Sequence, residues 1–570
     1  MICKTHRAVQ KKTGRLGRWY GSGLIAAGIA LSALTAGSAS AQDTAGSAQD
    51  CGKFLEKTRT VIGLKVGPQA CHFKESSFTF EGRDYIRLDV GLDGTVDGWV
   101  ADEGNYHEYL TNSPDLVFPQ AGNTSPRHQG VGTYESAKGA AMIIVYPRDQ
   151  GEWNQKMWVM VHGRGRSFKS GSLKPWDKYL EPGSPLSNLD KYDLLLVRKG
   201  YALVHTFRTS TENVGEIQTK LDDGRTVDWA SFNDTVHYIQ DFTQVAQNMM
   251  KARRGKAPRR TYIFGHSAGA RIGHDVNYTP GLNMRANGRP FFDGVLADDP
   301  AAGTWLPYQM RDGKDVLFAT EGDKKDFVPQ LDVVHQMYNN IAPRFDDSPG
   351  SVMSPSYLAN KRTNAKMILD KGLGDRQRTY EIRGVSHSGG ELVFDERERG
   401  ILPLKFIMDE FFDLLDAWAD KGEVPPHSRS DWAPVGELTA ENTIRYPAIS
   451  FPEISCPRGV YYPWPVSTSA MTAFTSFSGN GIEPLDENKQ FMDLNRNGVW
   501  DYVETMPQAW RRLGLLGSTE PLTRDKYVSC VTRAAELLQQ DGFFSPETTS
   551  AYVEKAKTQD LKLAAAPGAN

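Results

Sequence analysis

The sequence has no apolar run long enough to cross a membrane as a helix. A spanning helix needs about 20 consecutive apolar residues, and the run Leu24–Leu31 falls well short of that length. The chain also lacks a large excess of either charge, with 66 basic and 69 acidic residues, and it has no repeat at solenoid spacing. Apolar residues make up 39% and charged residues 24%, which excludes disordered and collagen-like classes. The 570 residues therefore suit a globular protein of two to four structural units.

The near-zero net charge hides an uneven distribution. The first 41 residues contain six basic residues and no acidic one, so the remaining chain has 60 basic and 69 acidic residues. A nucleic-acid binder needs a basic face to neutralise phosphates. The acidic body therefore argues against nucleic acid as a partner.

The N-terminal segment has the three parts of a secretory signal peptide. A basic stretch precedes the apolar run Leu24–Leu31, and the small residues Ala39-Ser40-Ala41 follow it. We expect cleavage after Ala41 and a mature protein that is secreted or periplasmic, without a membrane span. A membrane anchor is the alternative interpretation of this segment.

Cysteine is scarce, with five residues in the chain, and Cys3 belongs to the predicted signal peptide. The other four are an even number in an oxidising compartment, which predicts disulfides. Of the three pairings, Cys51–Cys71 with Cys456–Cys530 closes the shortest loops. Four free thiols are the alternative, and the spacing does not suit zinc.

Short apolar runs alternate with helical patterns between residues 140 and 426, after a polar stretch that ends near Gly139. This alternation predicts an α/β core with a mostly parallel sheet and helices on both faces. Residues 1–41 are the signal peptide, 42–139 a flexible leader to about Asp50 followed by a β-rich segment, and 427–570 a mainly helical or irregular extension. The expected strands are 77–81, 85–90, 141–146, 157–161, 202–205, 261–264, 294–297, 316–319 and 380–382, and the expected core helices lie within 234–251 and 405–419.

Gly265-His266-Ser267-Ala268-Gly269 is the sharpest chemical signal in the chain. It follows the expected strand 261–264 and precedes a helical pattern, which is the context that gives G-x-S-x-G its meaning. The two glycines allow close backbone approach in a strained turn that exposes the Ser267 hydroxyl. The Ala268 N–H, at the start of the helix, then faces the charge that develops on a bound carbonyl.

A serine hydroxyl needs a base to take its proton, and in this type of site the acid and then the histidine follow the serine in the chain. His387 follows the last expected strand and is the predicted base. The predicted acid is Asp326, which best fits the expected spacing, or Asp323, which lies nearer the end of strand 316–319. Asp298 and Asp299 after the preceding strand are further alternatives.

A second oxyanion donor is expected after strand 157–161, where His162-Gly163-Arg164-Gly165 offers small residues and exposed backbone. Gly163 or Arg164 is the predicted donor. An ordinary tight turn is the alternative interpretation of this segment.

Over residues 140–425 these residues resemble the α/β-hydrolase superfamily, in the chain order Ser267, Asp326 or Asp323, His387. The resemblance implies the α/β-hydrolase fold, serine-esterase chemistry and a pocket built from loops. The sequence departs from the esterase pattern at His-Gly-Arg-Gly, which replaces the three-glycine form of the oxyanion hole, and in the spacing of the acid loop.

Residues 493–504 match the twelve-residue EF-hand calcium loop. Gly498 stands at position 6, where the chain turns sharply around the ion, and Met506–Leu516 is the expected exiting helix. The predicted ligands are Asp493, Asn495, Asn497, the Val499 carbonyl, Asp501 and Glu504. We expect a structural Ca²⁺ that stabilises the C-terminal region, and no organic cofactor.

The leading interpretation is an exported serine hydrolase that cleaves small-molecule or polymeric carboxylic esters. A secreted serine peptidase with the same triad and a non-catalytic, calcium-dependent binding protein are the alternatives. The long segment 327–377, between acid and base, is expected to be an insertion beside the pocket. The sequence says nothing of the oligomeric state.

Overall fold

A computed structural model gives the fold, and the residues that it describes belong to one compact unit, Ala39–Asn570. The described residues are 41–42, 49–55, 59–61, 64–66, 70–93, 100–101, 139–162, 189, 191–207, 217–220, 226–229, 231–266, 268–278, 283–285, 287–299, 310–311, 314–315, 327–336, 372–383, 404–430, 448–456, 459–461, 482–484, 491–492, 501–502, 506–559 and 561.

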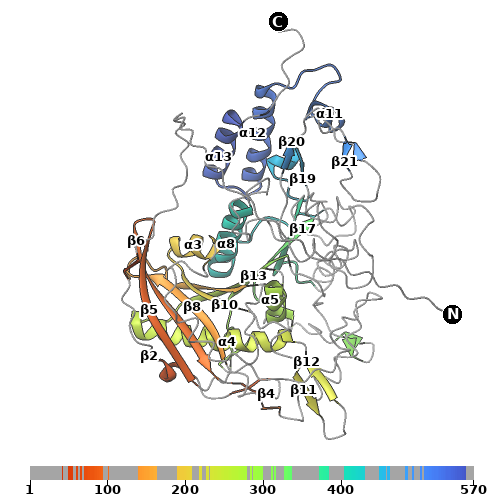
Figure 1. Cartoon of the computed structure of the whole chain (residues 1–570). Coiled ribbons are helices and arrows are strands. Elements are labelled where there is room, and N and C mark those ends of the chain that lie inside the picture. The colour runs from red at the N-terminus through yellow and green to blue at the C-terminus, as the bar shows by residue number, and fades with distance from the viewer. Residues whose placement is uncertain are drawn as a thin grey trace, which may run out of the picture. The chain divides into compact units, whose positions relative to one another are not determined.

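One mixed sheet of eleven strands forms the centre of the molecule (Figure 1). Its strand order is β1-β5-β6-β8-β10-β9-β13-β14-β17-β18, and β2 also pairs with β5. The strands are β1 (Ala41–Gln42), β2 (Gln49–Asp50), β5 (Ala70–Phe80), β6 (Arg83–Asp93), β8 (Gly139–Pro147), β9 (Lys156–His162), β10 (Ala202–Phe207), β13 (Arg260–His266), β14 (Gly294–Asp298), β17 (Gln330–Gln336) and β18 (Gln377–Arg383).

The half of the sheet from β10 to β18 is entirely parallel, as the alternation of strands and helices predicted. The other half is antiparallel, because β8 runs opposite to both β6 and β10, and β5 and β6 form a hairpin. The N-terminal strands thus extend the same sheet. Gln42 and Gln49–Asp50 pair with β5, so the expectation of a flexible leader up to Asp50 is wrong for these three residues.

On the side away from β13, β14 pairs with β17, a strand that the sequence did not predict. It lies inside the segment 327–377 that was expected to be an insertion, and that expectation is wrong for Gln330–Gln336. Polar residues at 330, 332 and 335 obscured the apolar pattern of this strand, yet all three are buried. The expected strand 316–319 lies outside the described residues.

Helices cover both faces of the sheet, as predicted, with α3 and α8 on one side and α4 and α5 on the other (Figure 1). The side chains of β9 alternate between the two resulting cores. Trp158 and Met160 pack with α3 and α8, whereas Val159 and Val161 pack with α4 and α5. The helices are α3 (Lys191–Arg198), α4 (Ser231–Arg254), α5 (Ala268–Tyr278) and α8 (Leu404–Lys421).

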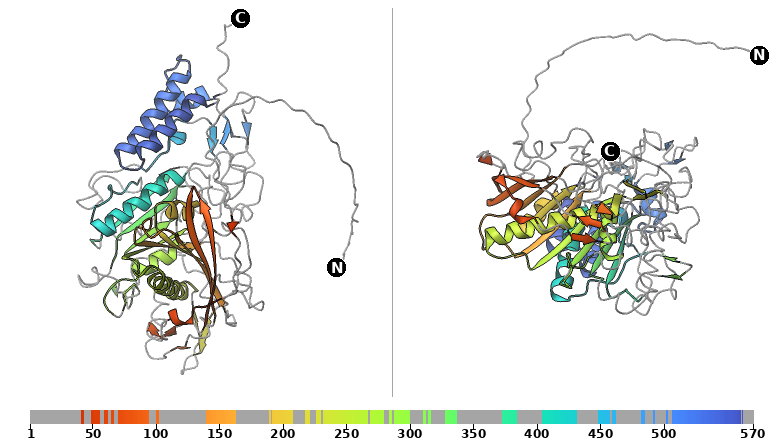
Figure 2. Two further views of the ribbon diagram at one scale, coloured as in Figure 1. Left: turned by 90° about the vertical axis from the view of Figure 1, so that its left-hand side faces the viewer. Right: turned by 90° about the horizontal axis from the view of Figure 1, so that it is seen from below.

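The C-terminal region, which contains four helices, packs against α8 through α13 (Figure 2, left). Phe406 on α8 contacts Tyr552 on α13 with ring centroids 5.8 Å apart, and Phe543 stacks edge-on against Tyr380 of β18 at 5.1 Å. Apolar residues after Pro426 therefore share a core with the sheet. These helices are α9 (Pro452–Ser455), α11 (Met506–Arg512), α12 (Arg524–Gln540) and α13 (Pro546–Thr558).

Short strands outside the main sheet form small ladders of two or three strands. They are β3 (Arg59–Val61), β4 (Leu64–Val66), β7 (Val100–Ala101), β11 (Ile217–Lys220), β12 (Thr226–Trp229), β15 (Met310–Arg311), β16 (Lys314–Asp315), β19 (Gly459–Tyr461), β20 (Ile482–Pro484), β21 (Phe491–Met492) and β22 (Asp501–Tyr502), and the 3₁₀ helix η1 spans Gly52–Phe54.

Both predicted disulfides are present. Cys51–Cys71 joins residues 20 apart, and Cys456–Cys530 joins residues 74 apart, linking α9 to α12. Because loop-closure entropy grows with the length of the closed loop, we expect the second bond to stabilise the fold by about 4 kcal/mol and the first by about 3 kcal/mol. Within the described ranges, no helix is both long enough and apolar enough to span a membrane.

Candidate active site

The turn between β13 and α5 is the structural context that the G-x-S-x-G pattern requires. β13 ends at His266 and α5 begins at Ala268, so one residue, Ser267, separates strand from helix. A Cβ added to Gly265 would overlap the Gly269 carbonyl group. Only glycine at position 265 therefore lets the first turn of the helix approach the strand this closely.

Gly269 brings the same turn against the end of β9. A Cβ at this position would overlap the Val161 carbonyl oxygen, one residue before β9 ends. Gly265 also lies opposite Val161 and Ala297 in the ladder. The carboxyl ends of β9, β13 and β14 therefore meet at the start of α5, whose N-terminal dipole favours negative charge there.

Beside this turn, Asp298 lies between two imidazoles. Its Oδ2 is 2.8 Å from Nδ1 of His266, and its Oδ1 is 3.0 Å from Nε2 of His335. Burial by itself raises the pKa of this carboxyl, but the imidazoles of His335 and His266 outweigh it and hold the pKa below its usual range. All three side chains are buried, with Asp298 only 2% exposed. Asp298 is therefore a buried carboxylate stabilised by two histidines.

Asp299 continues this cluster from a strained backbone position. Its φ is +44°, in the left-handed region that costs energy for residues with a Cβ. Its carboxylate accepts a hydrogen bond from the His335 backbone N–H at 3.1 Å, and its Oδ2 lies 3.5 Å from His335 Nδ1. Asp298 and Asp299 thus hold His335 from β17 at both ring nitrogens.

A second buried polar group fixes α5, whose first turn carries Ala268. His274 Nε2 on this helix lies 2.9 Å from Asp332 Oδ1 on β17, and the Asn277 amide donates to Gln330 Oε1 at 2.8 Å. Gln377 on β18 donates to the other Asp332 oxygen at 3.1 Å. These bonds set the rotation of α5 about its axis and hence the position of its N-terminus.

The structure describes only part of the predicted catalytic set. The backbone of Ala268 is at the start of α5, and Asp298 and Asp299 are at the carboxyl edge of the sheet. His266 and His335 were missed by the sequence analysis, although His266 stands inside the pentapeptide. The predicted catalytic residues that lie outside the described ranges are Ser267, His387, Asp326, Asp323, Gly163 and Arg164.

Val328 and Pro329, which closely follow Asp326 in the chain, lie at the amino edge of the sheet. The Pro329 carbonyl accepts a hydrogen bond from the N–H of Val295 near the start of β14, and Val328 N–H donates to Asn277. Asp298, in contrast, ends β14 at the carboxyl edge. The described residues that directly follow Asp326 thus lie at the opposite edge of the sheet from Asp298.

The predicted calcium loop is flanked by a strand on its N-terminal side. β21 and β22 pair antiparallel, with Met492 opposite Asp501, so the ends of segment 493–500 lie together. α11 starts at Met506, as expected for the exiting helix, but the entering element is a strand and not an EF-hand helix. Of the predicted ligands, Asp501 has a described backbone, while Asp493, Asn495, Asn497, Val499 and Glu504 lie outside the described ranges.

No protein-family model and no curated protein matches the chain. Among solved structures it is similar to a truncated carbohydrate esterase from gut microbiota, with 13% identity over 51% of this chain and 98% of that chain and a TM-score of 0.25. It is also similar to an esterase from Rhizomucor miehei, with 12% identity over 44% of this chain and 73% of that chain and a TM-score of 0.24. For the Pyrococcus horikoshii acylaminoacyl peptidase, the identity is 11% over 66% of this chain and 51% of that chain, with a TM-score of 0.26. These likenesses carry no part of the functional assignment.

Proposed function

We propose that this protein is an exported serine esterase of the α/β-hydrolase type, with Ser267 as its nucleophile. The observation that carries this proposal is the strand-turn-helix at Gly265–Gly269. Both glycines are required there by backbone approach, and one residue stands between strand and helix. A turn of this kind exposes its central side chain above the carboxyl edge of the sheet.

In the proposed reaction, the Ser267 hydroxyl oxygen attacks the ester carbonyl carbon while His387 takes the hydroxyl proton. The Ala268 N–H and a second N–H from Gly163 or Arg164 stabilise the resulting oxyanion. His387 then protonates the leaving alcohol as the ester bond breaks. Water, deprotonated by His387, releases the carboxylic acid from Ser267 and restores the enzyme.

Two groups of carboxylates compete for the role of triad acid. Asp326 and Asp323 have the chain order of the superfamily pattern, whereas Asp298 and Asp299 end the strand next to the nucleophile strand. Both oxygens of Asp298 already contact imidazoles. The described residues that directly follow Asp326, however, lie at the edge of the sheet opposite the nucleophile turn, so both groups stay candidates for the acid. An Asp→Asn change at the true acid should lower kcat about 10⁴-fold, and comparing the four Asn variants makes the assignment.

The proposed activity is tested with matched ester and amide substrates. We expect the purified protein to hydrolyse p-nitrophenyl acetate and butyrate and to leave peptide p-nitroanilides intact. Hydrolysis of the anilides at comparable kcat/KM would favour the peptidase. A folded protein that cleaves neither class would favour the non-catalytic binding protein.

Export and calcium binding belong to the same proposal. The N-terminal 41 residues supply the signal, and the two disulfides suit an oxidising compartment.

The donor set at 493–504 contains three carboxylates, two amides and a carbonyl, which is oxygen chemistry that suits Ca²⁺. The β21–β22 pairing, which brings the ends of segment 493–500 together, supports a closed loop. The ion would stabilise the segment before α11.

Removing calcium should destabilise the protein. A site filled at about 100 times its Kd contributes about 2.7 kcal/mol, so we expect EGTA to lower Tm by a few degrees. Asp493→Ala should lower Tm similarly and abolish the response to EGTA, while Asp375→Ala at an exposed position should respond like the wild type. An unchanged Tm in both EGTA and Asp493→Ala would contradict the structural calcium site.

A further inference from the structure

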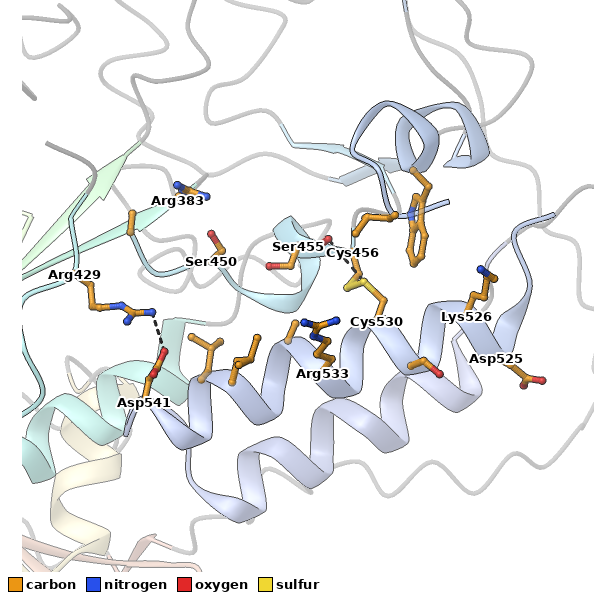
Figure 3. A pocket seen from close by; sticks show the side chains of 17 residues that line it. Arg383, Arg429, Ser450, Ser455, Cys456, Asp525, Lys526, Cys530, Arg533 and Asp541 are labelled. Carbon is orange, nitrogen blue, oxygen red and sulfur yellow. Dashed lines mark hydrogen bonds and ion pairs between the residues drawn. A yellow bond between two sulfur atoms is a disulfide. The ribbon is translucent and has the colours of Figure 1, made fainter. Parts of the chain in front are cut away.

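A cavity of about 730 Å³ lies between the edge of the sheet and helix α12 (Figure 3). Its volume is in the range of small-molecule sites. Arg383, the last residue of β18, lines it from the sheet side, and Arg533 lines it from α12. The disulfide Cys456–Cys530 joins the two sides. The described residues that line it do not include Ala268, Asp298 or Asp299.

One wall of the cavity is apolar. The lining includes Trp510, Leu515, Ala534 and Leu538 together with the disulfide. Leu537 also lines it and is 50% exposed, one of three large apolar side chains that are exposed among the described residues. An exposed leucine beside a hollow of this size offers apolar surface to a ligand.

Charge is uneven along the cavity. Figure 3 shows Arg383 and Arg429 at one end, Asp525 and Lys526 at the other, and Arg533 between them. The lining has four cationic and two acidic side chains, with Asp541 as the second carboxylate.

The cations differ in their partners. Arg429 donates to Asp541 at 2.8 Å, and Lys526 is paired with Glu520. Arg533 makes no hydrogen bond or ion pair with any residue in the described part of the chain. The buried hydroxyl of Ser450, also in the lining, likewise has no hydrogen-bond partner among the described residues. An uncommitted guanidinium thus belongs to the same lining as the apolar wall.

We propose that this cavity binds a small organic acid, with its carboxylate on Arg533 and its apolar body against Leu537, Leu538 and Trp510. Arg pairs with carboxylates through a planar fork of donors, which an inorganic anion also uses. The apolar wall, however, gives an inorganic anion nothing to contact. The combination therefore favours an amphiphilic acid.

Isothermal titration calorimetry with 2-naphthoate, 2-naphthamide and inorganic phosphate tests this proposal. We expect saturable binding of 2-naphthoate to the full protein, with 2-naphthamide and phosphate each at least tenfold weaker. Arg533→Ala should weaken 2-naphthoate binding about tenfold or more, and Arg533→Lys should lose less. Leu537→Ala should weaken it about threefold, as expected for lost apolar contact.

Lys555→Ala is the matched control, because Lys555 is an exposed cation on α13 outside the cavity lining. We expect it to bind 2-naphthoate like the wild type. Absence of 2-naphthoate binding to the wild type, equal binding of 2-naphthamide, or unchanged binding in Arg533→Ala would each overturn the proposal.

Discussion

Ser267→Ala should lower kcat for p-nitrophenyl butyrate by a factor of about 10⁴ to 10⁶. The hydroxyl oxygen is the atom that forms the acyl bond in the proposed reaction, and the methyl group of alanine cannot form that bond. His387→Ala should cause a loss of the same order. Because serine and base act as one unit, the double variant should lose no more than the worse single variant. Steady-state kinetics of the three proteins provide this comparison.

Stability separates this effect from misfolding. Loss of one serine hydroxyl should change the free energy of unfolding by less than about 0.5 kcal/mol. Ser76→Ala on β5 is a matched control and should retain wild-type kcat. Ester hydrolysis that survives in Ser267→Ala would exclude Ser267 as the nucleophile, whatever the kinetics of His387→Ala.

Asp298→Asn should reduce the free energy of unfolding at pH 7 by about 3 kcal/mol. The change removes the buried charge that faces His266 and His335, and breaking a buried pair from one side costs on the order of 3–5 kcal/mol. The amide keeps the shape of the carboxylate, so lost packing does not explain the effect. Asp375→Asn, at an exposed carboxylate 3.9 Å from Arg376, should be nearly neutral.

The stabilisation by the Asp298 carboxylate should also depend on pH, and the sign of this dependence follows from its pKa. The pKa of the Asp298 carboxyl is lowered in the folded protein, so its stabilising contribution is present above the unfolded pKa of about 4 and is lost as the pH falls through the lower folded value. Urea unfolding from pH 7 to pH 3 should therefore show the difference between wild type and Asp298→Asn shrinking below about pH 4. A difference that is absent at pH 7, or that grows on acidification, would contradict the buried charged cluster.

Local sequence signals predicted the central part of the fold well. Runs such as 157–161 and 261–264 are apolar on both faces because both faces of the sheet are covered, and they became β9 and β13. β17 was missed because buried polar residues of one strand find partners only in the folded molecule. Gln330 and Asp332 bond to α5, and His335 bonds to Asp299. Partners so distant in sequence leave no local pattern.

In the candidate site, too, local features could be predicted from the sequence and contacts between strands could not. The pentapeptide predicted a strand-turn-helix because its two glycines mark positions where the backbone leaves no room for a Cβ. Gly265 and Gly269 both lie at such positions. The contacts of Asp298 with His266 and His335 depend on the register between β13, β14 and β17. No spacing along the chain gives that register, so these histidines could not be assigned from sequence.

Labelling with a fluorophosphonate tests the central proposal most directly. The probe reacts only with a serine whose hydroxyl is activated by a nearby base, and peptide mass spectrometry locates the adduct. We predict one adduct on the peptide containing Gly265–Gly269, at Ser267, and none in Ser267→Ala or in the heat-unfolded protein. An adduct at another serine, or no adduct on folded protein that cleaves esters, would contradict Ser267 as the nucleophile.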